Sequence, residues 1–325
     1  MEVHASLTGP FPRSEAIVRA TRDLDRGRAT PEAVDRLYRA TEDELLQVEG
    51  RHSLEPRTGG YLRWADVFRP FASNWSGFEV GPVTRWFETN TFYRQPILHA
   101  PPERVAGSLL PWFPAANPAL PARHAKVILP GPYTFAGMLD NRSGETSEAL
   151  IHRLGRLLAA EVTELRGQGY ETFQFQEPLL VTRPPSGPAA ESTIAAYRSL
   201  GDAVGGGTSL VWTFFGDAGP ALPLLGRLPV SAVGVDLAET EPTALAGFPP
   251  GRGIGFGCLD PRTTLLEEPT EAAARVTAAC DLARPSGVWL GPGAPLDLLP
   301  WDAAVRKISA LTATRDLLAP KRGGA

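Results

Sequence analysis

The sequence predicts an α/β protein with one parallel sheet closed into a single (β/α)₈ barrel, and three observations lead to this fold class. Short β-type runs alternate with longer helical patterns along the last two thirds of the chain. Repeated strand–helix order requires parallel strands, and this many units in one chain favour a closed barrel over an open sheet. The length of 325 residues suits one barrel domain with a large core.

The first third of the chain shows a different pattern. One strand and two helices are expected there, at residues 3–7, 14–24 and 31–50. Ser14 and Thr30 are suitable N-capping residues, and Pro31 stands where the first turn of a helix tolerates proline. An aromatic stretch punctuated by prolines follows at 61–121, and we expect it to form an elaborated lobe near the barrel mouth.

From about residue 123 onward, strand and helix patterns alternate regularly. Strands are expected at 125–129, 171–176, 209–215, 232–237, 253–259 and 287–290. Helices are expected at 148–168, 190–204, 221–225, near 243, at 270–283 and at 301–318. We therefore expect one domain over 1–325, with a frayed tail at 320–325. The C-terminal ends of barrel strands carry the chemistry in this architecture.

The composition describes a globular protein without a polyanionic partner. The apolar fraction is 43%, the charged fraction is 21% and the net charge is −4, so we expect binding neither to nucleic acid nor to an anionic membrane. Cys258 and Cys280 form no disulfide framework, which favours a reducing compartment and hence the cytoplasm. A basic leader and a run of about 18 apolar residues are both missing, so neither export nor membrane insertion is expected.

The segment 173–180, FQFQEPLL, is the most informative short motif. Its alternating aromatic and amide residues have the period of a strand, and Pro178 ends the strand because proline has no N–H to donate. The carboxylate of Glu177 stands at this end, so we expect it at the barrel mouth.

Other motifs point to no familiar site. The glycines at 251–257 lack the spacing of a dinucleotide fingerprint and are expected to be strand or barrel-corner residues. The histidines have no metal-binding spacing. Cys258 ends an apolar strand, where it is either a thiol at the mouth or, as we favour, a small buried hydrophobic residue.

Five separated segments together resemble a known family. They are GPFPRSE at 9–15, TRWFETNTFY at 84–93, QFQEP at 174–178, WTFFG at 212–216 and GFGCLD at 255–260. In this order and spacing they resemble the cobalamin-independent methionine synthases. Members of that family usually contain two related (β/α)₈ barrels: a catalytic C-terminal barrel with zinc, and an N-terminal barrel that has lost the metal but helps to hold the folate. This chain is one barrel long and is similar to the N-terminal one.

The resemblance implies that zinc is not expected here. A His-x-Cys pair of the catalytic barrel falls on Thr213 and Phe215, and the fourth ligand, a cysteine, falls in the segment 291–294, which reads GPGA. Only Asp236 stands where the family has a ligand, and it replaces a glutamate. With three of four ligands missing, too few remain because a zinc site needs three or four.

The resemblance also removes the usual contacts of the substrate amine. The family holds that amine with two carboxylates, and their positions read Gly60 and Gln176 in this chain. A buried ammonium loses about 1.5–3 kcal/mol for each charge-assisted hydrogen bond that is missing. Homocysteine binding in the manner of the family is therefore not expected.

Some ligand-binding features of the family are retained. Arg13 and Arg19 would meet the polyglutamate tail of folate, and Trp86 would stack on the pterin. Each also has a structural alternative: Arg13 braces a loop, Arg19 lies on a solvated helix face, and Trp86 packs under the lobe. Glu177 could anchor a pterin through its two oxygens, or it could bind backbone donors at the barrel rim, which we favour. The residues implied in substrate binding are Arg13, Arg19, Trp86, Glu88, Asn90, Gln176 and Glu177.

These observations predict a folate-related or accessory half that works beside a separately encoded catalytic barrel in methionine synthesis. The implied ligand is 5-methyltetrahydrofolate. Two alternatives stay open, so whether the chain is itself an enzyme is not decided. One is an active methyltransferase, or a related C1 or thiol-group transferase, with a site rebuilt from Cys258, Asp236 and Glu177. The other is a small-molecule binding protein that catalyses no reaction.

Overall fold

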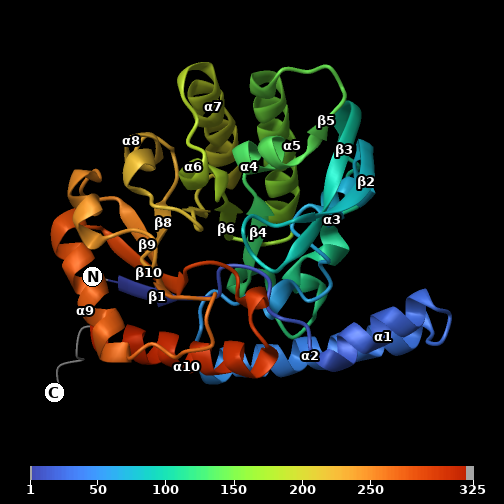
Figure 1. The fold of residues 1–325 in the computed structure, drawn as a ribbon, viewed down its shortest axis with the longest axis horizontal. Coiled ribbons are helices and arrows are strands. Elements are labelled where there is room, and N and C mark those ends of the chain that lie inside the picture. The colour runs from blue at the N-terminus through green and yellow to red at the C-terminus, as the bar shows by residue number, and fades with distance from the viewer. Residues whose placement is uncertain (1, 320–325) are drawn as a thin grey trace.

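A computed structural model describes residues 2–319 of the chain (Figure 1). Its centre is a parallel sheet of seven strands in the order β1-β10-β9-β8-β7-β6-β4. The strands are β1 (Glu2–Ala5), β4 (Lys126–Pro130), β6 (Thr172–Gln176), β7 (Thr208–Trp212), β8 (Ala232–Asp236), β9 (Gly253–Leu259) and β10 (Gly287–Pro292). The predicted α/β class and parallel sheet are confirmed, and the expected tail at 320–325 lies outside the described residues.

The sheet has seven regular strands where the sequence predicts eight. Its two edges, β1 and β4, are joined only by isolated bridges through an irregular segment. Glu55 forms an antiparallel bridge with Ala5, and Arg57 forms a parallel bridge with Ala125. The sheet is therefore curled so that its edges approach, but among the described residues no eighth strand joins it.

The residues after this segment explain why no strand continues there. Gly59, Gly60 and Tyr61 have φ angles of 60°, 73° and 50°, so three consecutive residues adopt the left-handed conformation. The Tyr61 hydroxyl then replaces the missing strand: it donates to the carbonyl of Lys126 at 2.8 Å and accepts from the amide of Ile128 at 2.7 Å. Backbone groups at the free edge of β4 thus bond to a side chain.

Helices surround the sheet (Figure 1). They are α1 (Glu15–Asp25), α2 (Pro31–Arg51), α3 (Arg69–Asn74), α4 (Pro132–Met138), α5 (Ser147–Gly167), α6 (Leu179–Thr182), α7 (Gly187–Val204), α8 (Leu222–Leu225), α9 (Pro269–Ala283) and α10 (Trp301–Leu318). The side chains of Ser14 and Thr30 cap α1 and α2 by accepting from the amides of Ile17 and Ala33, as the sequence predicts. The helix expected near residue 243 is a 3₁₀ turn, Pro242–Gly247. Within residues 2–319, none of the helices has the length and apolar character needed to span a membrane.

The aromatic stretch at 61–121 is more regular than expected. It contains the antiparallel hairpin of β2 (Ser76–Arg85) and β3 (Phe92–Glu103), and the short β5 (Asp140–Asn141) pairs with β3. Gly81 and Pro82 form a bulge opposite Gln95. Proline and glycine inside a strand weaken the period-two pattern, which is why the sequence predicts only an irregular lobe here.

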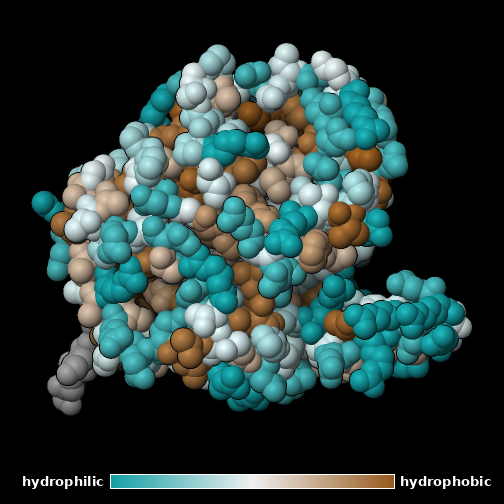
Figure 2. All heavy atoms as spheres, viewed as in Figure 1, coloured by the Kyte–Doolittle hydropathy of each residue, from teal (hydrophilic) through white to brown (hydrophobic). Residues whose placement is uncertain are grey.

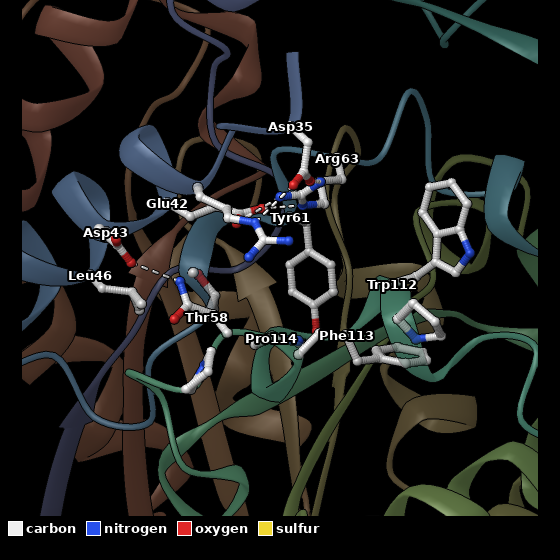
Figure 3. Close-up of a pocket in the computed structure, with 16 residues that line it drawn as sticks. Asp35, Glu42, Asp43, Leu46, Thr58, Tyr61, Arg63, Trp112, Phe113 and Pro114 are labelled. Carbon is white, nitrogen blue, oxygen red and sulfur yellow. Dashed lines mark hydrogen bonds and ion pairs between the residues drawn. The ribbon is translucent and has the colours of Figure 1, made fainter. Parts of the chain in front are cut away.

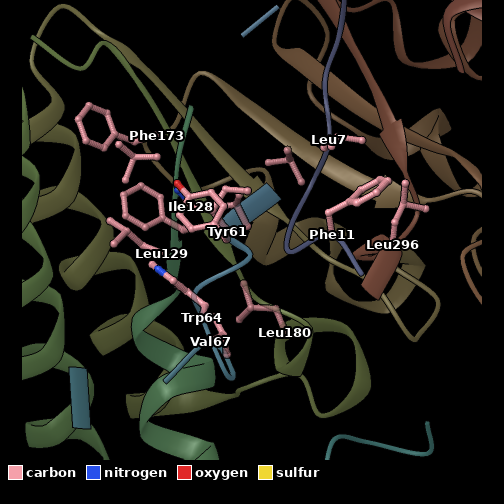
Figure 4. Packing of buried hydrophobic residues seen from close by; sticks show 14 of the residues in the cluster. Leu7, Phe11, Tyr61, Trp64, Val67, Ile128, Leu129, Phe173, Leu180 and Leu296 are labelled. Carbon is pink, nitrogen blue, oxygen red and sulfur yellow. The ribbon is translucent and has the colours of Figure 1, made fainter. Parts of the chain in front are cut away.

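One hydrophobic core fills the space between the sheet and its helices. Figure 4 shows part of it, where side chains from the N-terminal segment, β4, β6 and the segment after β10 meet around Tyr61 and Trp64. Inside the curled sheet, the ring of Trp212 takes the space left by glycines. A Cβ added at Gly234 or Gly255 would lie 2.3 or 2.4 Å from that ring. Of the glycines at 251–257, which were expected to be strand or barrel-corner residues, Gly253, Gly255 and Gly257 lie in β9 and Gly251 lies in the turn before it.

Candidate functional site

A small cavity lies at the mouth of the curled sheet, where the C-terminal ends of the strands converge. Its volume is about 60 Å³. The lining includes Trp64, Asp66, Trp86, Tyr93, Gln176 and Asp297, and we call it the mouth cavity. Two of the residues predicted from the sequence, Trp86 and Gln176, therefore line one space although they are far apart in the chain.

Gln176 belongs to a buried polar network beneath this cavity. Its Nε2 donates to the carbonyl of Thr8 at 3.0 Å, and Nε2 of Gln174 donates to the same carbonyl at 2.6 Å. Oε1 of Gln174 accepts from Lys126 Nζ at 2.8 Å, and Nζ also donates to Ser6 Oγ at 2.7 Å. The amide of Gln176 is therefore oriented from below by neutral partners.

Lys126, at the start of the edge strand β4, is a buried polar residue that sequence reasoning missed. Its side chain is buried, and burial lowers the pKa of its amine to about 7. The hydrogen bonds of this amine go to Ser6 and Gln174, and the nearby charge of Glu49 acts to raise its pKa but does not offset the effect of burial. The available signal was a single lysine inside an otherwise apolar strand.

Trp86 forms one wall of the mouth cavity. Its ring lies 5.7 Å from Phe68 and 5.5 Å from Tyr93 between centroids, in edge-on contacts, and the side chain is half-buried. Glu88 and Asn90 lie beyond it at the hairpin tip and are exposed. The sequence run that contains all three residues is therefore divided between the cavity wall and solvent.

The two arginines predicted to meet a polyglutamate tail are both exposed. Arg13 precedes α1 and interacts electrostatically with Asp297 of the mouth cavity. Arg19 lies on α1, which projects from the body of the molecule together with the first part of α2 (Figure 1). The surface of this projection is mainly hydrophilic (Figure 2). Of these two arginines, Arg13 is thus the one that interacts with a residue of the mouth cavity.

Glu177 is fully buried, and both of its carboxylate oxygens are occupied by donors. Oε1 accepts from the Tyr133 amide and the Tyr197 hydroxyl, both at 3.1 Å, and Oε2 accepts from the Thr134 amide at 2.7 Å and hydroxyl at 2.6 Å. Burial raises the pKa of this carboxyl to about 7 although the hydrogen bonds act to lower it. A Cβ at Gly131 would lie 2.1 Å from the carboxyl carbon. Glu177 thus joins the end of β6 to the first turn of α4.

Asp236 is also buried, but its carboxylate is poorly satisfied. Oδ1 accepts from the Ala238 amide at 3.0 Å, whereas Oδ2 is buried and has no hydrogen-bond partner. The Arg262 guanidinium lies 3.9 Å from Oδ2. Burial raises the pKa of Asp236 to about 6.

Cys258 faces the helices. It lines a small cavity together with Ala272 and Arg275 of α9. Burial raises the pKa of its thiol to about 12, which opposes formation of a thiolate near neutral pH. Within residues 2–319, no hydrogen bond or ion pair joins Cys258, Asp236 and Glu177 to one another.

The donors at the strand ends do not fit a zinc ion. Thr213 donates its hydroxyl to the carbonyl of Gly234 at 2.8 Å, and Phe215 has no metal-binding atom. In the described part of the chain, no three histidine, cysteine, aspartate or glutamate side chains gather closely enough to hold a metal. At Gly60, an added Cβ would lie 2.3 Å from Leu45, so this position has no room for a carboxylate side chain.

A larger cavity of about 500 Å³ lies along α2 (Figure 3). Its rim carries an ion-pair network in which Arg63 contacts Asp35 and Glu42, each at 2.7 Å. Asn117 donates to Asp43 at 2.9 Å across the same opening. These polar groups satisfy one another, and none of the residues predicted from the sequence lines this cavity. The mouth cavity is therefore the candidate site.

Comparisons with known proteins agree on one family. The family model described as "Cobalamin-independent synthase, N-terminal domain" matches residues 77–280. A methionine synthase of Sulfurisphaera tokodaii is 25% identical over 309 residues, covering 93% of this chain and 88% of the relative. A 5-methyltetrahydropteroyltriglutamate–homocysteine methyltransferase of Mycobacterium tuberculosis is 34% identical over 210 residues, covering 60% of this chain but 26% of the relative. This chain thus matches about a quarter of that longer protein.

The fold is also similar to that of a solved structure. The B12-independent methionine synthase from Shewanella sp. W3-18-1, in complex with selenomethionine, superposes with a TM-score of 0.77. The match covers 97% of each chain at 16% sequence identity, so it is a likeness of fold.

Proposed function

Because the chain belongs to the cobalamin-independent synthase family, whose N-terminal domain model it matches, we propose that it serves as a folate-binding accessory half in methionine synthesis. It acts beside a separate zinc-bearing barrel that carries the methyl transfer from 5-methyltetrahydrofolate to homocysteine. The relatives named above supply the substrate class, since one of them acts on 5-methyltetrahydropteroyltriglutamate and homocysteine according to its name.

The observation that carries this proposal is the set of side chains at the strand ends. Thr213, Phe215 and Gly60 offer neither metal ligands nor a carboxylate for an amine. A zinc ion would lower the pKa of a substrate thiol from about 8.5, and the side chains of residues 2–319 form no donor set to hold one. Activation of homocysteine therefore falls to a partner.

The mouth cavity retains groups suited to a pterin. Trp86 presents an aromatic ring at its wall, and Gln176 presents an amide oriented by Thr8. Arg13, which interacts with Asp297, supplies a positive charge for the carboxylates of a glutamate tail. The chain thereby binds and orients the folate while the partner performs the chemistry.

Metal analysis and a methyl-transfer assay test this proposal. The purified chain should contain no stoichiometric zinc and should not transfer a methyl group from 5-methyltetrahydrofolate to homocysteine by itself. Adding a catalytic barrel of the same family should restore turnover. Tightly bound zinc together with turnover by the isolated chain would overturn the proposal.

Titration calorimetry with 5-methyltetrahydrofolate tests the binding site. Trp86→Ala should weaken binding about tenfold, because stacking on an aromatic ring contributes about 1–3 kcal/mol. Trp112→Ala is the matched control, since Trp112 is a half-buried tryptophan that lines the other cavity. Equal affinities for both variants would place the ligand elsewhere.

A further inference from the structure

The tip of the β2–β3 hairpin, residues 86–91, reaches across the mouth to the segment that follows β7. The ring of Phe87 in this tip contacts the ring of Phe215, with 5.4 Å between centroids and an interplanar angle of 54°. The bulge at Gly81 and Pro82 lies in the hairpin before the tip. Bulges bend the strand that contains them, so the distal part of the hairpin can be directed toward β7.

Both contacting residues have an unusual backbone. Phe87 has φ 50° and Phe215 has φ 70°, which places two bulky side chains in the left-handed region. Such conformations persist only where the surroundings hold them, and they concentrate at ligand clamps and switch regions. Here each ring is supported by its neighbour in sequence, Trp86 at 4.9 Å and Phe214 at 4.8 Å between centroids.

The tip itself is held together as a unit. Thr89 donates its hydroxyl to the carbonyl of Trp86 at 2.6 Å and shares a hydrogen bond of 2.8 Å with the Thr91 hydroxyl. The amide of Trp86 donates to the Thr91 carbonyl at 3.0 Å. Residues 86–91 can therefore move as one body.

The mouth cavity is too small in this conformation for the ligand that the family implies. Its volume of about 60 Å³ holds roughly two water molecules, whereas small-molecule sites measure about 300–1,000 Å³. Both ends of the tip, Trp86 and Thr91, line the cavity, whereas Phe87 and Phe215 are not among its lining residues. Movement of the tip away from Phe215 would carry both lining residues with it. Separation of the two rings would widen the cavity.

We propose that residues 86–91 form a gate over the mouth cavity and that the contact between Phe87 and Phe215 latches it shut. This inference rests on the proposed function, and it describes how a ligand enters the mouth cavity. Opening separates the two rings, releases both left-handed residues and exposes Trp86 and Gln176 to a planar ligand.

Thiol labelling measures the opening without any ligand. Gln176→Cys, in a background of Cys258→Ser and Cys280→Ser, places one thiol at the wall of the mouth cavity for reaction with 5,5′-dithiobis(2-nitrobenzoate). Adding Phe87→Ala should accelerate labelling about tenfold, the effect expected from the loss of one aromatic contact. Val83→Ala is the matched control, because Val83 is 58% exposed on the same hairpin, and it should leave the rate unchanged.

Equal labelling rates with and without Phe87→Ala would overturn the gate, and so would labelling of the parent only at its global unfolding rate. If Gln176→Cys does not fold, hydrogen exchange of the amides at 86–91 replaces the thiol, with the same tenfold acceleration expected in Phe87→Ala and unchanged exchange contradicting the gate. Faster labelling without folate binding would retain the gate and remove the proposed function. Folate binding with equal labelling rates would retain the proposed function and remove the gate.

Discussion

Two buried carboxylates stand at strand ends of the same sheet, yet their surroundings are opposite in kind. Glu177 follows β6 and is 0% exposed, and Asp236 ends β8 and is 1% exposed. Glu177 accepts hydrogen bonds on both oxygens, whereas Oδ2 of Asp236 accepts none within residues 2–319 and has only the Arg262 guanidinium at 3.9 Å. Two equally buried carboxylates thus differ in hydrogen bonding: Glu177 is fully bonded, and one oxygen of Asp236 is not bonded.

The difference comes from what faces each carboxylate. Glu177 lies against the start of α4, where the first amides of a helix have no partner inside the helix and point outward. Asp236 lies against the backbone of Gly293, where an added Cβ would come within 2.4 Å of Oδ1. The N-terminus of α4 supplies hydrogen-bond donors to Glu177. The backbone at Gly293 supplies no donor to Oδ2 of Asp236.

Replacing Glu177 should have the largest effect. Glu177→Gln keeps the size but turns its amide hydrogens toward a backbone N–H that also donates. At least two buried donors then lack acceptors, so we expect a loss of about 3–5 kcal/mol in the free energy of unfolding. Urea denaturation measures it. The exposed Glu171→Gln should change stability by less than about 0.5 kcal/mol. A similarly small change at Glu177 would show that its hydrogen bonds do not brace α4.

Replacing Asp236 should raise the free energy of unfolding, whereas replacing Glu177 lowers it. The pKa of Asp236 is about 6 in the folded chain against an ordinary 3.8, so between these values the folded state binds more protons than the unfolded state. Asp236 should therefore contribute a fall in wild-type stability of about 1.4 kcal/mol per pH unit as the pH rises through that window. Glu177 and Asp297, whose pKa values are also raised by burial, add falls of the same sign. Asp236→Asn should make the fall shallower by the Asp236 share and be more stable than the wild type by up to about 3 kcal/mol at pH 7–8.

Urea denaturation at several pH values, with the exposed Asp281→Asn as control, distinguishes this outcome. Equal pH slopes for wild type and Asp236→Asn would mean that the unpartnered oxygen is accommodated without cost, and the contrast with Glu177 would vanish.

Replacing Cys258 should have the smallest effect. Its thiol faces the helices and forms its hydrogen bond with the carbonyl of Gly291, not with Glu177 or Asp236. Cys258→Ala should therefore cost about 1 kcal/mol of stability and leave ligand affinity unchanged. Denaturation and titration calorimetry measure the two quantities. A large loss of binding or turnover in this variant would instead favour a rebuilt catalytic site that includes Cys258.

Much of the fold could be predicted from local pattern, because most helices and strands of the second half follow a clear period. The strand expected at 209–215 nevertheless ends at Trp212, since Phe215 adopts a left-handed backbone that a ladder does not accommodate. The β2–β3 hairpin was missed because Pro82, Pro96 and the bulge at Gly81 interrupt its alternation. Of the predicted binding residues, Trp86 and Gln176 line the mouth cavity, and Glu88, Asn90 and Arg19 are exposed.

The sequence by itself determined the α/β class, the order of the strand–helix units and the strand end at Glu177, because these depend on short-range periodicity and on the missing N–H of Pro178. Only the tertiary structure decided that the Tyr61 hydroxyl bonds to the free edge of β4, that Lys126 lies inside the sheet and that Phe87 meets Phe215. Each of these is a contact between segments far apart in the chain. Local pattern states which residues are buried or extended, but the partner of a buried donor or ring is set by packing across the whole fold.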